Sequence, residues 1–220
     1  MKLINCVLNL LFPPICGICL KTSKTFICEN CRELVNLKLL NKIDTYSNKY
    51  FDNHLYIFEY EGIIRQRMLE YKFKNKAFIH SFFTEAVLNS KDNIQFIKQY
   101  DFIIPVPIHK NRKKERGGYN QSELIAKDIS LLLPSIKLVN KVLIKSKNAV
   151  AQSTLNRTQR QINVNNVYKI TNKEKICNKN ILIIDDIYTT GSTVNECAKV
   201  LKKAGASNLG ILTICKSFEA

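Results

Sequence analysis

The stretch from Ile181 to Thr193 constrains the fold of this chain more strongly than any other segment. It reads Ile-Leu-Ile-Ile-Asp-Asp-Ile-Tyr-Thr-Thr-Gly-Ser-Thr. Its leading apolar residues predict a short strand that is buried on both faces, as in a parallel sheet. We expect Asp185 and Asp186 to end this strand at the carboxyl edge of the sheet, where open α/β sheets bind their ligands.

The residues after the two aspartates favour an anion-binding turn. Hydroxyl groups, a permissive glycine and a run of backbone N–H groups come from Thr189, Thr190, Gly191, Ser192 and Thr193. The helix expected over Val194–Ala204 directs its positive end towards this turn. Because two carboxylates repel a free phosphate, the predicted ligand also carries hydroxyl groups or a metal ion, as a ribose 5-phosphate does. The alternative is a plain strand–turn–helix with a capping hydroxyl. It explains one hydroxyl, but not two aspartates and three threonines around a glycine.

The charge of the chain indicates an acidic partner. Its 220 residues carry a formal net charge of +16, from 34 Lys and Arg against 18 Asp and Glu. Such a basic surface attracts polyanions, which include nucleic acid, acidic lipid and phosphorylated ligands. A Lys-rich proteome is the alternative explanation. The length allows one ordinary α/β domain with a small appendage, and the share of hydrophobic residues, 45%, argues against a disordered chain.

Four cysteines near the amino end have the spacing of a zinc site. Cys16 and Cys19 form one C-x2-C pair, and Cys28 and Cys31 form a second pair after a short spacer. Four thiolates close a tetrahedral shell around zinc, which marks a structural site with no open position for catalysis. Free or redox-active thiols are the alternative. We expect a zinc-finger domain at residues 1–45 and a larger domain at residues 46–220. The finger is either a prop or a docking site for nucleic acid or a partner protein.

The amino end does not match a signal peptide. Leu3–Leu11 is apolar, but it runs directly into two prolines and the cysteine pattern without a small-residue cleavage site. We expect a short packing helix there. No apolar run approaches the roughly 20 residues of a membrane span. The predicted location is therefore the cytoplasm, where thiols stay reduced and paired cysteines favour a metal over a disulfide.

Two basic stretches are candidate nucleic-acid contacts. In the first, Lys72, Lys74 and Lys76 alternate with aromatic residues, which suits phosphate pairing combined with base stacking. The last turn of a helix also favours lysine, so the alternation could equally mark a helix end. The second stretch contains Arg112, Lys113, Lys114 and Arg116, and it suits a pyrophosphate or a nucleic-acid backbone. A solvated surface loop is the alternative for the second stretch.

The order of the remaining elements predicts an α/β fold. Apolar residues at helical spacing predict helices at Gly62–Lys72, Ala77–Asn89 and Glu123–Leu133. Strands are predicted at His54–Tyr60, Asp101–Pro107, Leu138–Lys145, Val167–Ile170, Ile181–Ile184 and Asn208–Cys215. Because strands alternate with helices, we expect a mostly parallel sheet flanked by helices. Ile108, His109 and Lys110 then follow a strand at the ligand edge.

Several motifs in a fixed order resemble those of a known family. Ile181–Thr193 resembles the phosphoribosyl pyrophosphate signature of type I phosphoribosyltransferases. Three further motifs accompany it: the cysteine pattern, the IPVPIHKNRKKERGGYNQ stretch, and the pattern Gln152, Leu155, Arg160, Asn163. Together they resemble the ComF family of competence proteins over nearly the whole chain. The resemblance implies a type I phosphoribosyltransferase-like fold with an N-terminal zinc finger.

The resemblance also implies roles for individual residues. Asp185 and Asp186 would meet the ribose hydroxyls, and the loop after them would bind the 5-phosphate. The predicted ribose-phosphate site consists of Asp185, Asp186, Tyr188, Thr189, Thr190, Gly191, Ser192 and Thr193. A pyrophosphate loop would come from Ile108, His109 and Lys110, with Mg2+ bridging the ligand. Lys147–Asn163 would form a hood over the site.

Two functions from different classes stay open. ComF proteins are associated with natural transformation, so the first is a cytoplasmic DNA-uptake factor acting at or inside the inner membrane. It would bind incoming single-stranded DNA non-specifically, and a ribose phosphate such as phosphoribosyl pyrophosphate. The second is an active phosphoribosyltransferase of unknown acceptor, since no residues specify an acceptor base. A helicase or channel of the uptake machinery is the expected protein partner, docked by the finger.

Overall fold

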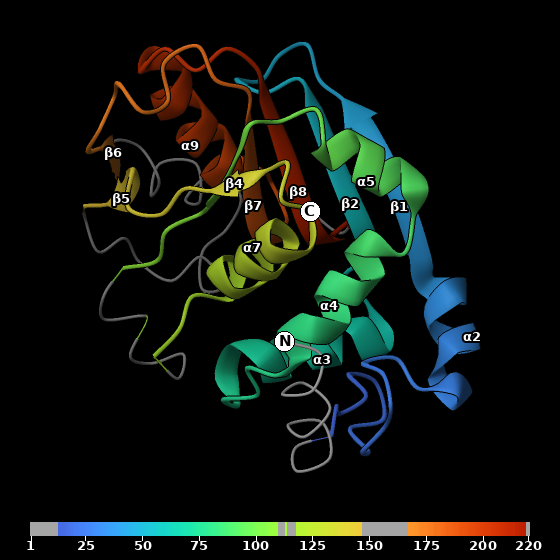
Figure 1. Ribbon diagram of the computed structural model, residues 1–220. Helices are drawn as coiled ribbons and strands as arrows, with labels where there is room; N and C mark the ends of the chain where they lie inside the picture. The colour runs from blue at the N-terminus through green and yellow to red at the C-terminus, as the bar shows by residue number, and fades with distance from the viewer. Residues whose placement is uncertain (1–12, 110–112, 114–117, 147–166, 219–220) are drawn as a thin grey trace.

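A six-stranded sheet forms the centre of the molecule. The computed structural model describes residues 13–109, 113, 118–146 and 167–218. The strand order is β1-β2-β8-β7-β3-β4 (Figure 1). These strands are β1 (Leu39–Thr45), β2 (Asn53–Glu59), β3 (Phe102–Pro105), β4 (Lys137–Leu138), β7 (Ile181–Tyr188) and β8 (Leu209–Lys216). All neighbouring pairs are parallel except β1 with β2, so the predicted mostly parallel sheet is confirmed.

The central strand β7 is buried on both faces, as its run of apolar residues predicts. Leu182 and Ile184 belong to a core on one face of the sheet, which also contains buried residues of α3, α4, α5 and α7. Ile181 and Ile183 belong to a second core, on the other face, with residues of α9. These helices are α3 (Gly62–Phe73), α4 (Ile79–Leu88), α5 (Lys91–Ile97), α7 (Gln121–Leu132) and α9 (Ser192–Lys203). The sheet is therefore covered on both sides, which confirms the predicted α/β fold.

The region predicted as one strand, Leu138–Lys145, is divided between two sheets. Leu138 ends β4, which pairs with β3, whereas β5 (Leu143–Lys145) pairs with β6 (Tyr168–Ile170) in a separate antiparallel ribbon. Between them, Lys141 has a φ of 67°. This left-handed conformation turns the chain away from the main sheet. The prediction of one strand is therefore wrong.

The cysteine-rich segment packs against the body of the protein. It leads into α2 (Glu29–Lys38), and Figure 1 shows it in blue, beside α3 and α4. Ile18, Ile27 and Val35 belong to the same core as α3 and α4. A Cβ placed on Gly17 would lie 2.2 Å from Phe82 Cβ, so a glycine is required for this close approach. The finger thus packs closely against α4.

Strand β1 extends the main sheet with residues that the predicted boundary assigns to the finger. Leu39–Thr45 pairs with β2, and Ile43 lies opposite Leu55. Neither β1 nor the helices α2 and α5 was expected from the sequence. The division of the chain at residue 45 stays a prediction, and it cuts the chain directly after a strand of the main sheet.

Candidate functional site

The carboxyl end of β3 lies beside the middle of β7, because these strands are parallel neighbours and Pro105 pairs with Ile184. Ile108 and His109 follow β3 and are partly buried, and the threonine-rich loop follows β7. The path after β3 is fixed by two hydrogen bonds: the Val106 N–H donates to the Ile184 carbonyl at 2.9 Å, and Asn120 Nδ2 donates to the Val106 carbonyl at 3.0 Å. The fold therefore brings two segments with predicted ligand contacts to one edge of the sheet.

The two aspartates lie inside β7 rather than at its end, which corrects the sequence prediction. Asp185 is paired with Thr213 of β8, and Tyr188 is paired with Lys216. Because β8 extends to Lys216, it supplies backbone hydrogen-bond partners beyond the apolar run of β7. The acidic pair is consequently held on a rigid strand.

Asp186 is paired with a lysine from a distant part of the sequence. Lys72, near the end of α3, donates from Nζ to Asp186 Oδ1 at 2.7 Å. The exposed fractions of the two side chains are only 12% and 10%. Lys72 was predicted to contact DNA, and nothing in its local pattern indicated a partner 114 residues away.

Asp185 accepts two hydrogen bonds on one of its carboxylate oxygens. Its Oδ1 accepts from Ser122 Oγ at 3.3 Å and from the Asp186 backbone N–H at 2.9 Å. Burial and the neighbouring charge of Asp186 raise the pKa of Asp185 to about 7. Ser122 lies in the predicted opening turn of a helix, but its contact with Asp185 was not expected from the sequence. Together, Lys72 and a proton on Asp185 offset the charge of the acidic pair.

Replacing Asp185 with asparagine is expected to stabilise the protein at high pH. The folded pKa of about 7 lies above the ordinary aspartate value, so the folded state keeps a proton that the unfolded chain releases. Stability conferred by this proton is present at low pH and is lost as pH rises through about 4 to 7. Urea denaturation of Asp185→Asn should therefore show a gain of about 1–3 kcal/mol at pH 8 and little change at pH 4. An equal effect at both pH values would contradict the raised pKa.

The loop after β7 is tightly held at its glycine. Gly191 has a φ of 73°, and a Cβ at this position would lie 2.3 Å from the hydroxyl oxygen of Tyr188. Both constraints exclude a side chain. Thr190 Oγ1 and Ser192 Oγ are 2.7 Å apart and share a hydrogen bond at the N-terminus of α9. The predicted hydroxyl-rich turn at a helix start is thus present, with Gly191 at the N-cap.

Tyr188 supports this loop from within a buried aromatic group. Its ring stacks on His54 with 4.3 Å between centroids, and His54 Nε2 lies 2.7 Å from Thr213 Oγ1. Burial, with a contribution from the charge of Lys216, lowers the pKa of His54 to about 3, so the imidazole is neutral. Lys216 Nζ lies 5.9 Å from the Tyr188 ring centroid. These contacts hold the Tyr188 ring against Gly191. No local pattern in the sequence indicated a role for His54.

Only some residues of the first basic stretch are exposed to solvent and thus accessible to a nucleic acid. Tyr71 is fully buried, so it is not available for stacking on a base. Phe73 and Lys74 are exposed. Lys76 donates to Glu70 Oε2 at 2.9 Å, while Lys74 lies 3.9 Å from the other carboxylate oxygen. The helix does end at this position, where Phe73 and Lys74 are exposed and Lys76 is partly exposed.

Of the second basic stretch, the structure describes one residue. Lys113 is exposed, and its Nζ lies 3.8 Å from Glu123. The other predicted DNA contacts of this stretch lie outside the described residues: Arg112, Lys114 and Arg116. Lys110 of the predicted pyrophosphate loop also lies outside them. The hood predicted at Lys147–Asn163 and the helix predicted at Leu3–Leu11 also lie outside them.

The four cysteines of the finger converge on one point. The Sγ atoms of Cys16, Cys19, Cys28 and Cys31 all lie within 4.8 Å of one another. Cys19 Sγ and Cys28 Sγ are 3.8 Å apart. A tetrahedral shell with Zn–S bonds of about 2.3 Å requires sulfur atoms about 3.8 Å apart. The Cys28 backbone N–H also lies 3.5 Å from Cys16 Sγ, as expected for a thiolate ligand. The cluster is therefore compatible with a structural zinc ion.

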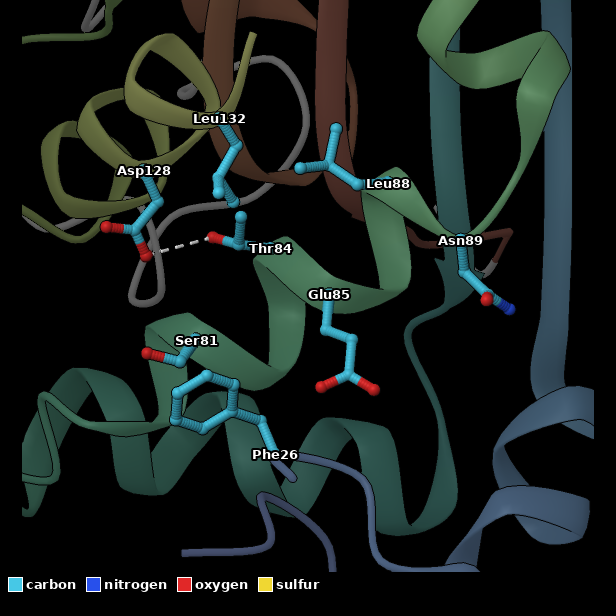
Figure 2. Close-up of a pocket in the computed structure, with 8 residues that line it drawn as sticks. All are labelled: Phe26, Ser81, Thr84, Glu85, Leu88, Asn89, Asp128 and Leu132. Carbon is cyan, nitrogen blue, oxygen red and sulfur yellow. Dashed lines mark hydrogen bonds between the residues drawn. The ribbon is translucent and has the colours of Figure 1, made fainter. Parts of the chain in front are cut away.

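A separate cavity of about 360 Å³ lies between the finger, α4 and α7 (Figure 2). Phe26 comes from the finger, Glu85 from α4 and Asp128 from α7. Asp128 accepts hydrogen bonds from Thr84 and His80, and Arg32 lies 3.7 Å from Glu85. Of the predicted ligand and DNA residues that the structure describes, none lines this cavity. It is distinct from the edge of the sheet at which the predicted ligand segments meet.

Comparisons with known proteins agree with the motifs and the fold. The family model of the phosphoribosyl transferase domain matches residues 115–219, which contain β7, its loop and α9. Competence protein F of Haemophilus influenzae is 30% identical over 152 residues, 67% of this chain and 65% of that protein. Competence protein ComFC of Bacillus subtilis is 25% identical over 207 residues, 92% of this chain and 78% of that protein. The chain fits the ComF family.

A second group of relatives has a different name. DNA utilization protein YhgH of Escherichia coli is 29% identical over 117 residues, 53% of this chain and 50% of that protein. The match to the Haemophilus relative likewise spans slightly less than two thirds of that relative's length, 65%. Within the described residues, no helix combines the length and apolar character that a membrane crossing requires.

Proposed function

We propose that this protein is a DNA-uptake factor that acts in the cytoplasm, at or inside the inner membrane, on incoming single-stranded DNA. On this proposal it binds DNA non-specifically and also binds a ribose phosphate such as phosphoribosyl pyrophosphate. The observation that carries the proposal is the meeting of the acidic pair, the glycine loop and the segment after β3 at one sheet edge. The names of the competence and DNA utilization relatives support the DNA-uptake role.

The chemistry of this edge suits a sugar phosphate. Asp185 and Asp186 offer carboxylate oxygens that accept hydrogen bonds from ribose hydroxyls. The hydroxyls of Thr190 and Ser192, at the positive end of α9, offer donors to a 5-phosphate. Mg2+ would arrive with the ligand and neutralise its pyrophosphate, and oxygen-rich surroundings suit this ion. Ile108 and His109 would contact the pyrophosphate from the neighbouring strand.

The proposed DNA surface combines charge with an aromatic ring. Lys74 has 67% of its side chain exposed, and Phe73 is 59% exposed on the same helix end. Lys76 adds a partly exposed ammonium group near this helix end, and Lys113 is an exposed lysine of the second basic stretch. The proposed DNA contacts also include Arg112, Lys114 and Arg116, which lie outside the described residues. The buried ring of Tyr71 and the paired ammonium of Lys72 make a smaller contribution than the sequence suggested. The finger is the proposed docking site for a helicase or channel.

Binding to single-stranded DNA should weaken steeply as salt rises. Each neutralised phosphate contributes about −0.7 to the slope of log K against log salt concentration. Replacing Lys74 and Lys113 together with glutamine should make the slope less negative by about 1.4, because two phosphate contacts are lost. Fluorescence anisotropy with a labelled oligo-dT measures both slopes.

The matched control for this experiment removes the same charge elsewhere. Lys91 and Lys98 are exposed at the two ends of α5, on another part of the molecule (Figure 1). Replacing both with glutamine should leave the slope nearly unchanged. An equal change of the slope in the two double variants would indicate that binding depends on net charge and not on this surface. Salt-independent binding would refute the DNA-binding surface.

An active phosphoribosyltransferase is the second candidate, favoured by the same acidic pair and loop. Such an enzyme stabilises an oxocarbenium-like ribose and a departing pyrophosphate, largely by placing charges. The test is release of pyrophosphate from phosphoribosyl pyrophosphate across a panel of purine and pyrimidine bases. Release with any base would favour an enzyme. Ligand binding without release would favour a pocket used only for binding.

A further inference from the structure

We propose that Lys72 is the counter-ion that allows the acidic pair to accept an anionic sugar phosphate. This inference rests on the proposed function, because it assigns a role to Lys72 in the same site. Lys72 would keep Asp186 oriented as a hydrogen-bond acceptor for a hydroxyl group while cancelling its charge against the ligand phosphates. It would therefore be a positioning residue of the pocket and not a contact for DNA.

The position of Lys72 is fixed from two sides. Tyr119 donates from its hydroxyl to the Tyr71 carbonyl at 2.6 Å, and Tyr71 donates from its own hydroxyl to the Gln121 carbonyl at 2.8 Å. These bonds hold the end of α3 against the start of α7. Ser122, at that same start, donates to Asp185. One rigid junction thus presents a cation to Asp186 and a hydroxyl donor to Asp185.

The charges at this junction explain why a cation is needed there. Two adjacent carboxylates at the carboxyl end of a parallel sheet repel a phosphorylated ligand, and the low exposure of Lys72 and Asp186 weakens solvent screening. The ammonium of Lys72, 2.7 Å from Asp186, removes one of these negative charges. A buried ion pair adds little to folding stability on balance, since desolvation offsets the attraction. The main consequence of the Lys72–Asp186 pair is then a less negative potential within the site.

Lys74, two residues further along the chain, differs from Lys72 in exposure and in partner. Its side chain is 67% exposed, and its closest carboxylate belongs to Glu70 rather than to the acidic pair. The same helix end therefore has one lysine directed into the sheet edge and one directed into solvent. This division assigns Lys72 to the ligand and leaves Lys74 for the proposed DNA surface.

The test measures the affinity of phosphoribosyl pyrophosphate with Mg2+ by isothermal titration calorimetry at pH 6 and pH 8. In Lys72→Met, binding at pH 8 should be about 30-fold weaker or more, because a buried charge has lost its partner. The loss should be smaller at pH 6, where a proton on the acidic pair partly replaces the ammonium. Lys72→Arg should restore most of the affinity. Lys38→Met breaks a Lys–Glu pair of 2.9 Å away from the site and should change nothing.

The remaining outcomes separate this inference from the proposed function. Affinity within twofold of wild type in Lys72→Met at both pH values would overturn the inference alone. A loss that is equal at both pH values and is not restored by arginine would also overturn it, in favour of a structural role. Failure of wild-type protein to bind would overturn the proposed function. The counter-ion role would then be decided by urea denaturation of Lys72→Met, which must lose more stability at pH 8 than at pH 6.

Discussion

Replacing Arg67 with methionine is expected to lower the free energy of unfolding by about 3–5 kcal/mol. Arg67 is 8% exposed, and it joins the finger to the body of the protein. Its Nε donates to the Ile18 carbonyl at 2.7 Å, and its Nη1 donates to Glu70 Oε2 at 2.9 Å. Methionine fills a similar volume, but it donates no hydrogen bond. The buried Ile18 carbonyl then loses its donor, and the buried carboxylate of Glu70 loses one of its cationic partners. Urea denaturation gives the change directly.

The control for Arg67 lies on the same helix. Arg65 is exposed, with its guanidinium 5.8 Å from the ring centroid of Tyr60. Arg65→Met removes the same charge and should change stability by no more than about 1 kcal/mol. Similar losses in both variants would mean that α3 responds to net charge rather than to the buried contact with Ile18.

Replacing Cys16 and Cys19 with serine should abolish metal binding and release the finger from α4. Serine does not provide the thiolate that zinc requires, and two ligands are insufficient for a structural site. Metal binding supplies a large part of the folding free energy of small zinc domains, about 10–16 kcal/mol in isolated finger peptides. The loss here should be smaller, because Ile18, Ile27 and Val35 also pack in the main core.

Two measurements check this expectation. Metal content by atomic emission should fall from one zinc per chain to nearly zero, and limited proteolysis should cut within residues 13–38. Cys177→Ser is the matched control, since Cys177 is exposed and lies outside the cluster. Unchanged metal content in the double variant would show that the four-thiolate assignment is wrong.

Features that depend on local pattern could be predicted from the sequence. Ile181–Ile184 was identified as a buried strand because a parallel strand covered on both faces must be apolar throughout. The cysteine spacing predicted a cluster because zinc dictates both ligand type and number. By contrast, β1 was missed because it is an edge strand with a mostly polar sequence, and only Leu39, Leu40 and Ile43 are large apolar residues in it.

Features that depend on distant partners could not be predicted. Lys72 appeared as one lysine in a basic run, and its pairing with Asp186 results from the packing of α3 against the sheet. Ser122 and His54 reach the site in the same way, from elements far from β7 in sequence. The two aspartates were expected to end their strand, but β7 continues past them because its neighbour β8 extends to Lys216.

We propose that Asp185 and Asp186 belong to a ribose-phosphate pocket that is separate from the proposed DNA surface. The most direct test titrates phosphoribosyl pyrophosphate with Mg2+ into wild-type protein and into a variant with both aspartates replaced by asparagine. We expect the wild type to bind and the variant to bind about 100-fold more weakly or worse, since two carboxyl groups that accept hydrogen bonds are lost. Affinity for single-stranded DNA should be the same in both proteins. Equal ligand affinity in the two proteins, or no binding by the wild type, would contradict the account.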